Sequence, residues 1–364
     1  MPILKTLIRA TKLEKEKFTI PKSVQDAIPI RRIWPDGIFQ VGSRFSKTFS
    51  FTDINYSIAG KDDKTAMFLD YSELLNSLDS GASAKITINN RKVNKEEFEK
   101  SLLLPMKEDG LDPFRKEYNE MLLSKVTGTN NSVVQDRYIT ITVAKRNIDE
   151  ARTYFSRVGT ELITHLSQLS SIGRELDIES RLQIFRDFFK GNEPAAFDFD
   201  LKGHMKKGHS FKDWLCPDSM EFQKDHFRLN DRWGRVLYLQ DYASYIKDSM
   251  IAELCDLNRS LMLSIDILTV PTDEAVREIQ NKLLGVETNA ANWQRKQNAV
   301  NNFSAVLPYD MEQQRKETKE MLDDLTTRDQ RMMFGLVTLV HLADSKQQLD
   351  SDTETLYSTA RKHL

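Results

Sequence analysis

Apolar and polar residues alternate along three short stretches near the start of the chain. The stretches IPIRRIW (28–34) and IFQV (38–41) flank the turn-forming Pro35-Asp36-Gly37, and RFSKTFSF (44–51) follows Gly42. A period of two residues is typical of strands that bury one face, and glycine and proline favour the turns between them. The pattern therefore predicts an antiparallel meander.

After the meander the apolar period lengthens to that of a helix, and strands return twice. A helix is expected at 63–80, where apolar residues recur three or four positions apart. Its expected buried face consists of Met67, Phe68, Tyr71, Leu74, Leu75 and Leu78. Strands are expected at 84–89 and 136–145, and further helices at 94–104, at 114–126, from Asn147 onward and at 179–190.

The second half of the chain repeats this order of elements. A hairpin is expected from HFRL (226–229) and RWGRVLYLQD (232–241). The elements expected after it are a helix at 244–257, a strand at 260–270, helices at Thr272–Leu307 and Asp310–Thr327, a strand at 332–342 and a helix at 345–364.

The two predicted hairpins also resemble each other residue by residue. At a constant offset, IFQVGSRFSKTFSFTD (38–53) aligns with HFRLNDRWGRVLYLQD (226–241). The aligned identities are Phe39 with Phe227, Arg44 with Arg232 and Asp53 with Asp241. Internal similarity followed by the same order of elements indicates a duplication. The expected fold is α+β, with two similar ββαβααβα lobes in which helices cover one face of each mostly antiparallel sheet.

The boundaries of these lobes are expected where turn-forming residues gather. Pro194, Gly203 and Gly208 interrupt the pattern between the two halves, and a basic N-terminal stretch breaks at Pro21. The expected domains are an N-terminal arm at 1–27, a first lobe at 28–190, a linker at 191–212 and a second lobe at 213–364.

Charge and cysteine content narrow the function classes. The chain has 52 Lys and Arg against 54 Asp and Glu, so no global basic field draws it to nucleic acid, and such binding would have to be local. Two cysteines cannot build a disulfide framework and fit a reducing compartment such as the cytosol. No signal peptide is expected, and the apolar run at 334–343 is too short for a membrane span.

Motifs for nucleotide binding and nucleophilic catalysis are missing from the sequence. Gly60-Lys61 is followed by Asp62, so no phosphate-binding loop of the G-x-x-x-x-G-K-[ST] type is present, and neither G-x-G-x-x-G nor G-x-S-x-G occurs. We therefore expect this chain to be non-catalytic and to hold no cofactor. Asp53 and Asp241 each end a hairpin strand and are expected as helix caps or turn acceptors.

Histidines and carboxylates elsewhere favour structural interpretations. The spacing of His204, His209, Cys216 and His226 matches no zinc pattern, so no metal site is expected. His165 and His341 stand among apolar residues and are expected in the core. The stretch DSDTE (350–354) begins like a calcium loop but lacks its later glycine and glutamate, so we expect helix surface there.

Two further features could contact nucleic acid. Tyr238, Tyr242 and Tyr245 could stack on bases, although packing is the favoured interpretation. The second feature is a basic loop, for which a solvated surface loop is the alternative interpretation. Its candidate contacts for phosphate or an acidic partner are Lys202, His204, Lys206, Lys207, His209 and Lys212.

Several stretches resemble a known family. SVQDAIPIRRIWPDGIFQV (23–41), RFSKTFSFTDINYSIAGKDDKTAMFLDYSELLNSLDS (44–80) and CPDSMEFQKDHFRLNDRWGRVLYLQDYASYI (216–246) are similar to the N-terminal region of the large conjugation ATPases of type IV secretion systems. This is the TraE/TrbE/CagE class, the counterpart of the fourth VirB protein, as carried by Gram-positive conjugative elements. VETNAANWQRKQNAVNNF (286–303) and MMFGLVTLVHLADSKQQLDSDTETLYS (332–358) look like its later region.

The resemblance implies a non-catalytic docking and assembly domain. By that resemblance the chain is an N-terminal fragment, with ATP and magnesium bound only by a C-terminal ATPase domain that it lacks. The implied partners are type IV secretion membrane subunits at the cytoplasmic face of the membrane, the ATPase domain itself and further copies in an oligomer. The implied location is cytoplasmic and peripheral at the inner face of the membrane. The charge-rich segment Asp310–Arg331 is expected as a partner surface, with a solvated helix as the alternative interpretation.

Two rival functions stay open. One is a nucleic-acid-binding module that uses the basic loop at 202–212 together with the N-terminal arm. The other is an enzyme whose site is assembled between the two lobes, which the spacing of residues in the sequence does not test.

Overall fold

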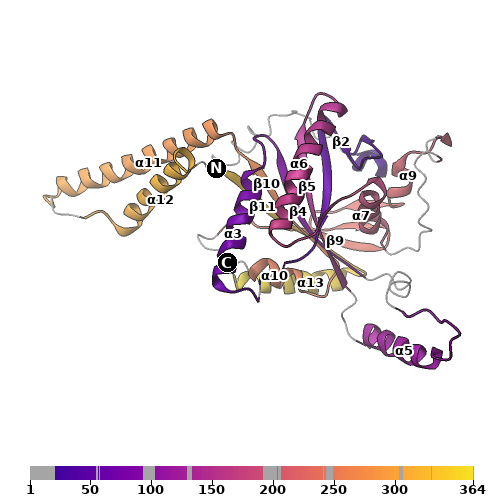
Figure 1. The fold of residues 1–364 in the computed structure, drawn as a ribbon. Coiled ribbons are helices and arrows are strands. Elements are labelled where there is room, and N and C mark those ends of the chain that lie inside the picture. Colours follow the sequence, from indigo (N-terminus) through magenta and orange to yellow (C-terminus); the bar gives the residue numbers. More distant parts are fainter. Residues whose placement is uncertain are drawn as a thin grey trace. The chain divides into compact units, whose positions relative to one another are not determined.

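A computed structural model shows a mixed α+β protein built on a large, mainly antiparallel sheet (Figure 1). It describes residues 21–54, 56, 58–92, 103–128, 133–191, 203, 206–240, 242, 249–302, 306–328 and 330–363. The described strands are β1 (Arg32–Ile33), β2 (Phe39–Val41), β3 (Arg44–Phe51), β4 (Ser83–Lys92), β5 (Val133–Ala144), β6 (Gly173–Glu175), β7 (Met220–Phe222), β8 (Phe227–Leu229), β9 (Arg232–Tyr238), β10 (Leu261–Thr269) and β11 (Met333–Ala343).

The helices in the described part of the chain are α2 (Val24–Ala27), α3 (Lys61–Asn76), α5 (Asp112–Gly128), α6 (Ile148–Gln168), α7 (Ile178–Lys190), α9 (Phe211–Leu215), α10 (Ser249–Cys255), α11 (Thr272–Ala299), α12 (Tyr309–Thr326) and α13 (Lys346–Arg361). Several begin at a side-chain cap: Asn147 accepts a hydrogen bond from the backbone of Glu150, and Ser345 accepts one from Gln348. Such caps satisfy backbone donors that the first helical turn leaves unpaired. The capped starts of α6 and α13 each follow a long strand directly.

All strands of the two predicted lobes lie in one sheet. Its order is β1-β2-β3-β5-β4-β10-β11-β9-β8-β7, with β6 paired to β3. The pairings described between neighbours are antiparallel. From one end of the sheet toward its middle, the strands of the first half of the chain follow in the order β2-β3-β5-β4. From the other end, the strands of the second half follow in the order β8-β9-β11-β10, which places the corresponding strand of each half at the same position. The expected separate sheet in each lobe is therefore not observed, because β4 pairs with β10 and neither strand is left with an open edge.

The chain forms two compact units, and neither coincides with a predicted lobe. One unit contains Tyr56–Ser83 and Ile267–Gly335, which include α3, α11 and α12. The other contains Ala84–Asp266 and Leu336–Leu364 together with the N-terminal strands. Each unit thus draws on both halves of the sequence.

Several predicted elements differ from the observed ones at their ends. The helix expected to reach Leu307 ends at Ala299, where Asn301 adopts a left-handed backbone with φ 58° that stops the helix. Most of the N-terminal arm, of the helix expected at 94–104 and of the linker at 191–212 lies outside the described residues. Phe68 and Tyr71, expected on the buried face of α3, are exposed, whereas Leu74 and Leu78 are buried.

The residues around the WPDG turn form one of the cores of the second unit. Ile28, Phe39 and Leu182 pack there with Leu215 and Cys216, which follow the predicted linker. Gly37 has φ +74°, and a Cβ at this position would lie 2.2 Å from the carbonyl oxygen of Leu176. Only glycine fits this turn without strain.

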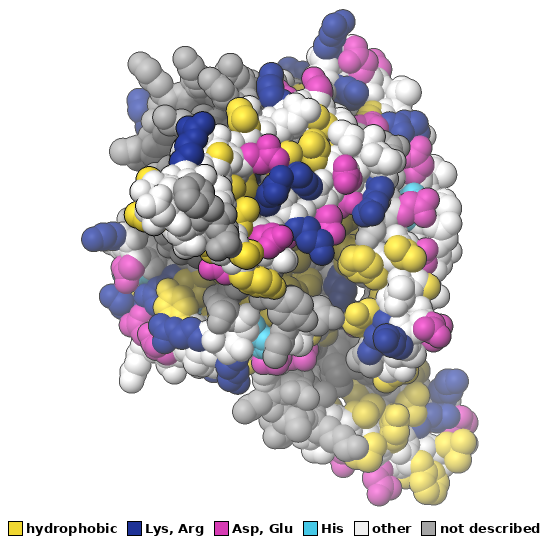
Figure 2. Space-filling view, turned by 90° about the vertical axis from the view of Figure 1, so that its left-hand side faces the viewer, with side chains coloured by type: hydrophobic (Ala, Val, Ile, Leu, Met, Phe, Trp, Pro, Cys, Tyr) yellow, Lys and Arg dark blue, Asp and Glu magenta, His cyan; other side chains and the backbone are white. Residues whose placement is uncertain are grey.

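Charges of both signs are mixed over the face shown in Figure 2, where Lys and Arg alternate with Asp and Glu. No helix in the described part of the chain is long and apolar enough to span a membrane.

Candidate functional site

The described part of the basic loop leads into the short helix α9. Lys206, Lys207 and His209 are exposed, and Nδ1 of His209 lies 3.9 Å from the Asp213 carboxylate. Ser210 begins α9 with a capping box that also uses Asp213. Lys202 and His204 lie outside the described residues. The structure therefore shows three of the six predicted basic residues on an exposed surface.

Lys212 differs from these three because its ammonium group is used within the fold. Its Nζ donates hydrogen bonds to the carbonyl oxygens of Gln25 at 2.8 Å and Ile28 at 2.7 Å. These carbonyls lie at the C-terminal end of α2, where helix carbonyls lack partners and a cation is favourable. Lys212 thus fastens α2 to α9, a role that the sequence pattern did not indicate.

Of the two carboxylates predicted to end the hairpin strands, Asp53 lies within the described residues and Asp241 does not. Asp53 is largely exposed, accepts a hydrogen bond from Arg137 at 2.8 Å and accepts one from the backbone of Ile54 at 2.9 Å. That is the turn-acceptor role expected from the sequence. Asp241 and Tyr245 lie outside the described residues, while Tyr238 and Tyr242 are exposed.

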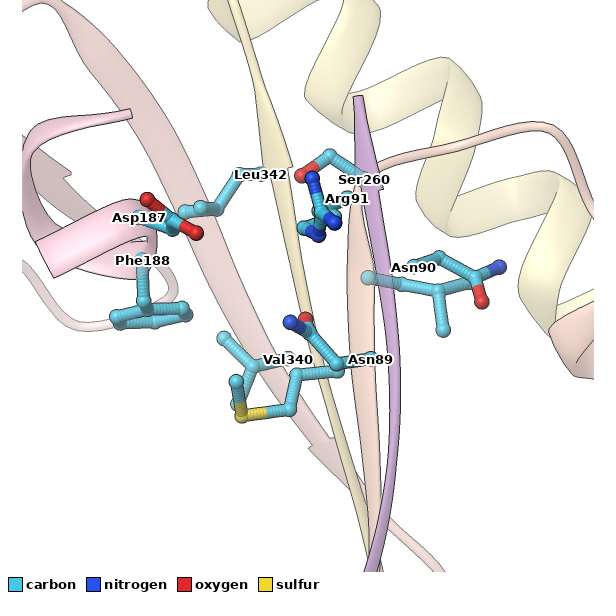
Figure 3. A pocket seen from close by; sticks show the side chains of 10 residues that line it. Asn89, Asn90, Arg91, Asp187, Phe188, Ser260, Val340 and Leu342 are labelled. Carbon is cyan, nitrogen blue, oxygen red and sulfur yellow. The ribbon is translucent and has the colours of Figure 1, made fainter. Parts of the chain in front are cut away.

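A small pocket lies between the end of α7 and strands β4, β10 and β11 (Figure 3). Its volume is about 20 Å³, room for roughly one water molecule, whereas ligand pockets are typically about 300–1,000 Å³. Two of its polar side chains already have partners: Asn90 donates to the Cys255 carbonyl at 2.6 Å, and Arg91 pairs with Asp136 at 2.7 Å. This pocket does not accommodate a nucleotide.

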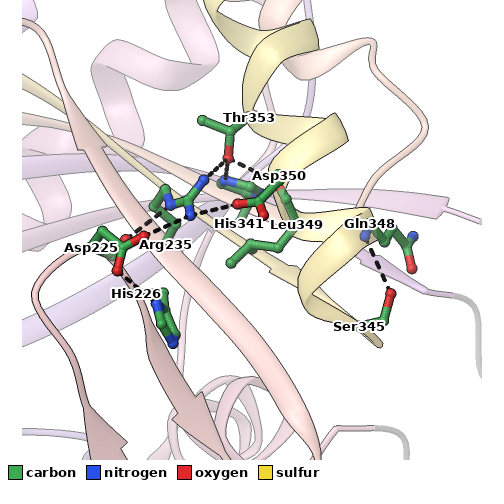
Figure 4. A network of polar contacts seen from close by, with 9 residues as sticks. All are labelled: Asp225, His226, Arg235, His341, Ser345, Gln348, Leu349, Asp350 and Thr353. Atoms are coloured by element: carbon green, nitrogen blue, oxygen red, sulfur yellow. Dashed lines mark hydrogen bonds and ion pairs between the residues drawn. The ribbon is translucent and has the colours of Figure 1, made fainter.

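A polar network joins β9, β11 and α13 through Arg235 (Figure 4). Nη1 of Arg235 donates to the Thr353 hydroxyl at 2.7 Å, and Nη2 donates to Asp350 at 2.8 Å. Nε donates to the backbone carbonyl of Asp225 at 2.9 Å. The His226 ring lies 2.8 Å from the Asp225 carboxylate and lowers the pKa of that carboxyl group. The network ties the strands to the helix.

The stretch at 350–354 was expected on the surface of a helix, and the structure agrees only in part. It lies in α13, as expected, and Asp350 is partly exposed. Asp352 and Thr353, however, are buried. Asp352 forms an ion pair with Arg259, which supplies the charge that a buried carboxylate needs.

His341 is held in one neutral form inside this network. Because the Thr353 hydroxyl donates to the Leu349 carbonyl at 2.8 Å, it must accept a hydrogen bond from Nε2 of His341, 3.1 Å away. Nδ1 of His341 is buried without a hydrogen-bond partner in the described structure. Burial, with Arg235 and Arg259 nearby, lowers the pKa of His341 to about 4. Its place in the core agrees with the expectation from sequence.

The other histidines and cysteines are dispersed. His165 is half-buried on α6 and contacts Gln168 at 3.1 Å, so it is less enclosed than expected. Cys216 and Cys255 are buried thiols, and burial raises the pKa of Cys255 to about 12. Within the residues that the structure describes, no three His, Cys, Asp or Glu side chains gather as metal ligands.

The helices α11 and α12 form a helical hairpin within one of the two compact units (Figure 1). The two helices pack along each other through Ala275, Ile279, Val286, Thr318 and Leu325, which are buried. Glu287 on α11 lies 3.8 Å from both Arg315 and Lys319 on α12. Packing and ion pairs of this kind hold the pair together as a defined surface.

Apolar side chains also lie on the outside of this hairpin. Leu284 on α11 and Met321 on α12 are exposed, as are Val300, Val306 and Tyr309 at the end where the helices connect. Large apolar groups left in water near one another are typical of interaction sites. A partner surface is expected from charge at Asp310–Arg331, and the charge pattern does not indicate these apolar residues. Leu284 lies outside the stripe of buried residues on α11, and that position in the helical period could have identified it as exposed.

Comparison of the chain with models of protein families and with curated proteins finds no match. The resemblance to conjugation ATPases therefore rests on the sequence stretches that carry it.

Proposed function

We propose that this chain is a non-catalytic docking and assembly domain of a type IV secretion ATPase. In this proposal the chain holds membrane subunits at the cytoplasmic face, while the ATPase domain of the same protein binds ATP and magnesium. The same proposal gives it a peripheral location at the membrane and contacts with further copies in an oligomer. The sequence stretches quoted above support the family.

A duplication within the domain belongs to the same proposal. The strand order supports it, since β2-β3-β5-β4 and β8-β9-β11-β10 run inward from opposite ends of the sheet. Two copies of one module fused edge to edge would produce this order. The predicted lobe boundaries at 28–190 and 213–364 would then mark the copies in sequence.

The observation that carries the docking role is the outer surface of the α11–α12 hairpin. The side chains of Leu284 and Tyr309 are 66 % and 78 % exposed. They lie on helices that already bury other apolar residues against each other. Exposing such side chains is unfavourable in water, by about 25 cal/mol for each Å² that a partner could cover. A partner that buries them would recover this free energy.

The experiment that tests this role is co-purification. The full chain would be co-expressed with the membrane subunits of a type IV secretion system from a Gram-positive conjugative element, and complexes would be isolated from detergent extracts through a tag on the membrane subunit. The proposal predicts that the chain co-purifies in stoichiometric amount. Recovery no greater than that of an unrelated tagged membrane protein would contradict it.

The second candidate function is a nucleic-acid-binding module, and one observation favours it. Lys206, Lys207 and His209 are exposed next to one another at the start of α9. Binding through phosphates would weaken steeply with salt, because each neutralised phosphate releases counterions. Fluorescence anisotropy with a labelled single-stranded and a double-stranded DNA between 50 and 200 mM salt tests this. Tight, salt-sensitive binding that Lys206→Glu with Lys207→Glu abolishes would favour the module over docking.

A further inference from the structure

Between β4 and β5 the chain makes an excursion from the sheet, of which residues 103–128 are described. Side-chain hydrogen bonds hold this part in place, and we call it the braced excursion. Asn119 on α5 is buried and holds the preceding segment by two hydrogen bonds to the backbone of Leu104. Its Oδ1 accepts from the Leu104 N–H at 2.9 Å, and its Nδ2 donates to the Leu104 carbonyl at 2.9 Å. The Asn119 amide thus satisfies both the N–H and the C=O of Leu104, as a neighbouring strand would, and holds the segment around Leu104 against the helix.

A charged cluster fixes the other end of the same segment. Arg115 donates to Asp112 at 2.7 Å and to Asp109 at 2.5 Å, and Asp112 accepts hydrogen bonds from the backbone of Lys107 and Glu108. The hydrogen bond from Arg115 lowers the pKa of Asp109 to about 2. Residues 103–111 therefore lie on α5 in a defined conformation.

This braced excursion presents apolar side chains to solvent (Figure 2, lowest part of the view). They are Leu104, Met106, Leu111, Phe114, Tyr118 and Met121, which are between 42 % and 68 % exposed. Together they present on the order of 600 Å² of apolar surface, at the upper end of the largest patches on typical monomers. Phenylalanine, tyrosine and methionine are residues that interfaces favour.

The spacing of these residues defines a single stripe. Leu111, Phe114, Tyr118 and Met121 are three and four positions apart, the pattern of a helix face that packs against another helix. At about 100° per residue, Glu117 borders the stripe beside Met121, whereas Lys116 and Glu120 lie on the opposite face. Glu117 is exposed. One edge of the stripe is therefore acidic.

We infer that α5 is a docking site for an amphipathic helix of another protein, with apolar residues at helical spacing and lysine or arginine along one edge. The apolar stripe would bury the apolar face of that helix, and Glu117 would face its basic edge. The polar bracing reduces the ordering cost of binding, because the surface is formed beforehand. This inference stands independently of the proposed function, since it rests on α5 alone.

The same observations argue against a second copy and against a lipid surface. Two copies packed antiparallel through this stripe would bring Glu117 of one copy against Glu117 of the other. A bilayer with anionic lipids repels an acidic edge and attracts a basic one.

Site-specific photo-crosslinking tests the inference. A benzophenone amino acid would replace Tyr118 in the full chain, within cells that produce the protein, and crosslinked peptides would be identified by mass spectrometry. Replacement of Lys116 on the opposite face is the matched control. We expect crosslinks at 118, at least tenfold stronger than at 116, to an apolar segment of another protein bearing lysine or arginine. Adding Glu117→Lys should lower that yield several-fold.

Other outcomes would overturn the inference. Crosslinks from 118 to a second copy of the chain, to lipid or to another segment of the same chain would name a different occupant. Equal yields at 116 and 118, or no crosslink at 118, would show that the stripe holds no partner. A yield unchanged by Glu117→Lys would remove the acidic edge from recognition.

Discussion

Nη1 of Arg181 donates a hydrogen bond to the carbonyl oxygen of Gly37 at 2.6 Å, although the two residues are far apart in sequence. The same nitrogen donates to the Ser46 carbonyl at 2.7 Å, and the guanidinium lies 4.0 Å from the ring centre of Phe39. Arg181 is buried, and burial lowers its pKa to about 9, so the side chain stays charged at neutral pH. α7 is thereby locked to the WPDG turn and to β3.

Replacing Arg181 should therefore destabilise the protein. Arg181→Leu removes the donor that the Gly37 and Ser46 carbonyls share, and the loss of the desolvated charge offsets only part of that cost. We expect the free energy of unfolding to fall by about 2 kcal/mol. Urea unfolding followed by circular dichroism measures it. The exposed Arg328→Leu is the control, with an expected change within about 0.5 kcal/mol. Equal effects of the two substitutions would show that the Arg181 contacts are not needed.

His341 should make stability depend on pH. Its pKa is about 4 in the folded protein and 6.5 in the unfolded chain, so as pH falls the unfolded chain takes up the proton first. The stabilisation is complete above pH 6.5 and is lost between pH 6.5 and 4, by about 3 kcal/mol in total. His341→Gln should lose correspondingly less stability over this interval in urea titrations. If variant and wild type lose stability in parallel, the histidine is not the titrating group.

Asn119 should control local order in the α5 excursion rather than global stability. Asn119→Ala removes both hydrogen bonds to Leu104, so residues 103–111 would open without disturbing the sheet. Hydrogen exchange measured by mass spectrometry should become at least tenfold faster there and stay unchanged in β3 and β5. Slow exchange preserved in 103–111 would mean that other contacts hold the segment.

The chain should not bind nucleotide by itself. It carries no phosphate-binding loop, and the pocket beside Asn90 and Arg91 has a volume of about 20 Å³. Titration calorimetry with magnesium and ATP up to millimolar concentration should give only the heat of dilution. Saturable heat would reveal a nucleotide site that neither motif nor pocket indicates.

Local elements could be predicted from the sequence because their periodicity depends on neighbouring residues. The stretch 44–51 was expected as a strand and is β3, and the helix expected from Asn147 is α6, capped by that residue. The pairing of β4 with β10 could not be predicted, since alternation specifies which face is buried and not which strand is adjacent. For the same reason, the joining of both halves in one sheet was missed.

Side-chain roles that depend on distant partners were also beyond prediction. Lys212 was expected in an exposed basic loop, but its bonds to α2 involve residues far away in the chain. Phe68 was expected in the core because a helical period identifies an apolar face without showing how much of it is covered. The buried Asp352 depends on Arg259, which no local pattern connects to it.

The proposed docking role of the α11–α12 hairpin is tested most directly by the affinity of the chain for purified type IV secretion membrane subunits in detergent. Biolayer interferometry would compare the wild type with the double variant Leu284→Ser, Tyr309→Ser, and with the control Asn289→Ser, an exposed residue of α11 on a different side from Leu284. We expect the double variant to bind at least tenfold more weakly and the control to bind like the wild type. Equal affinity of all three, or no binding by the wild type, would contradict the docking role.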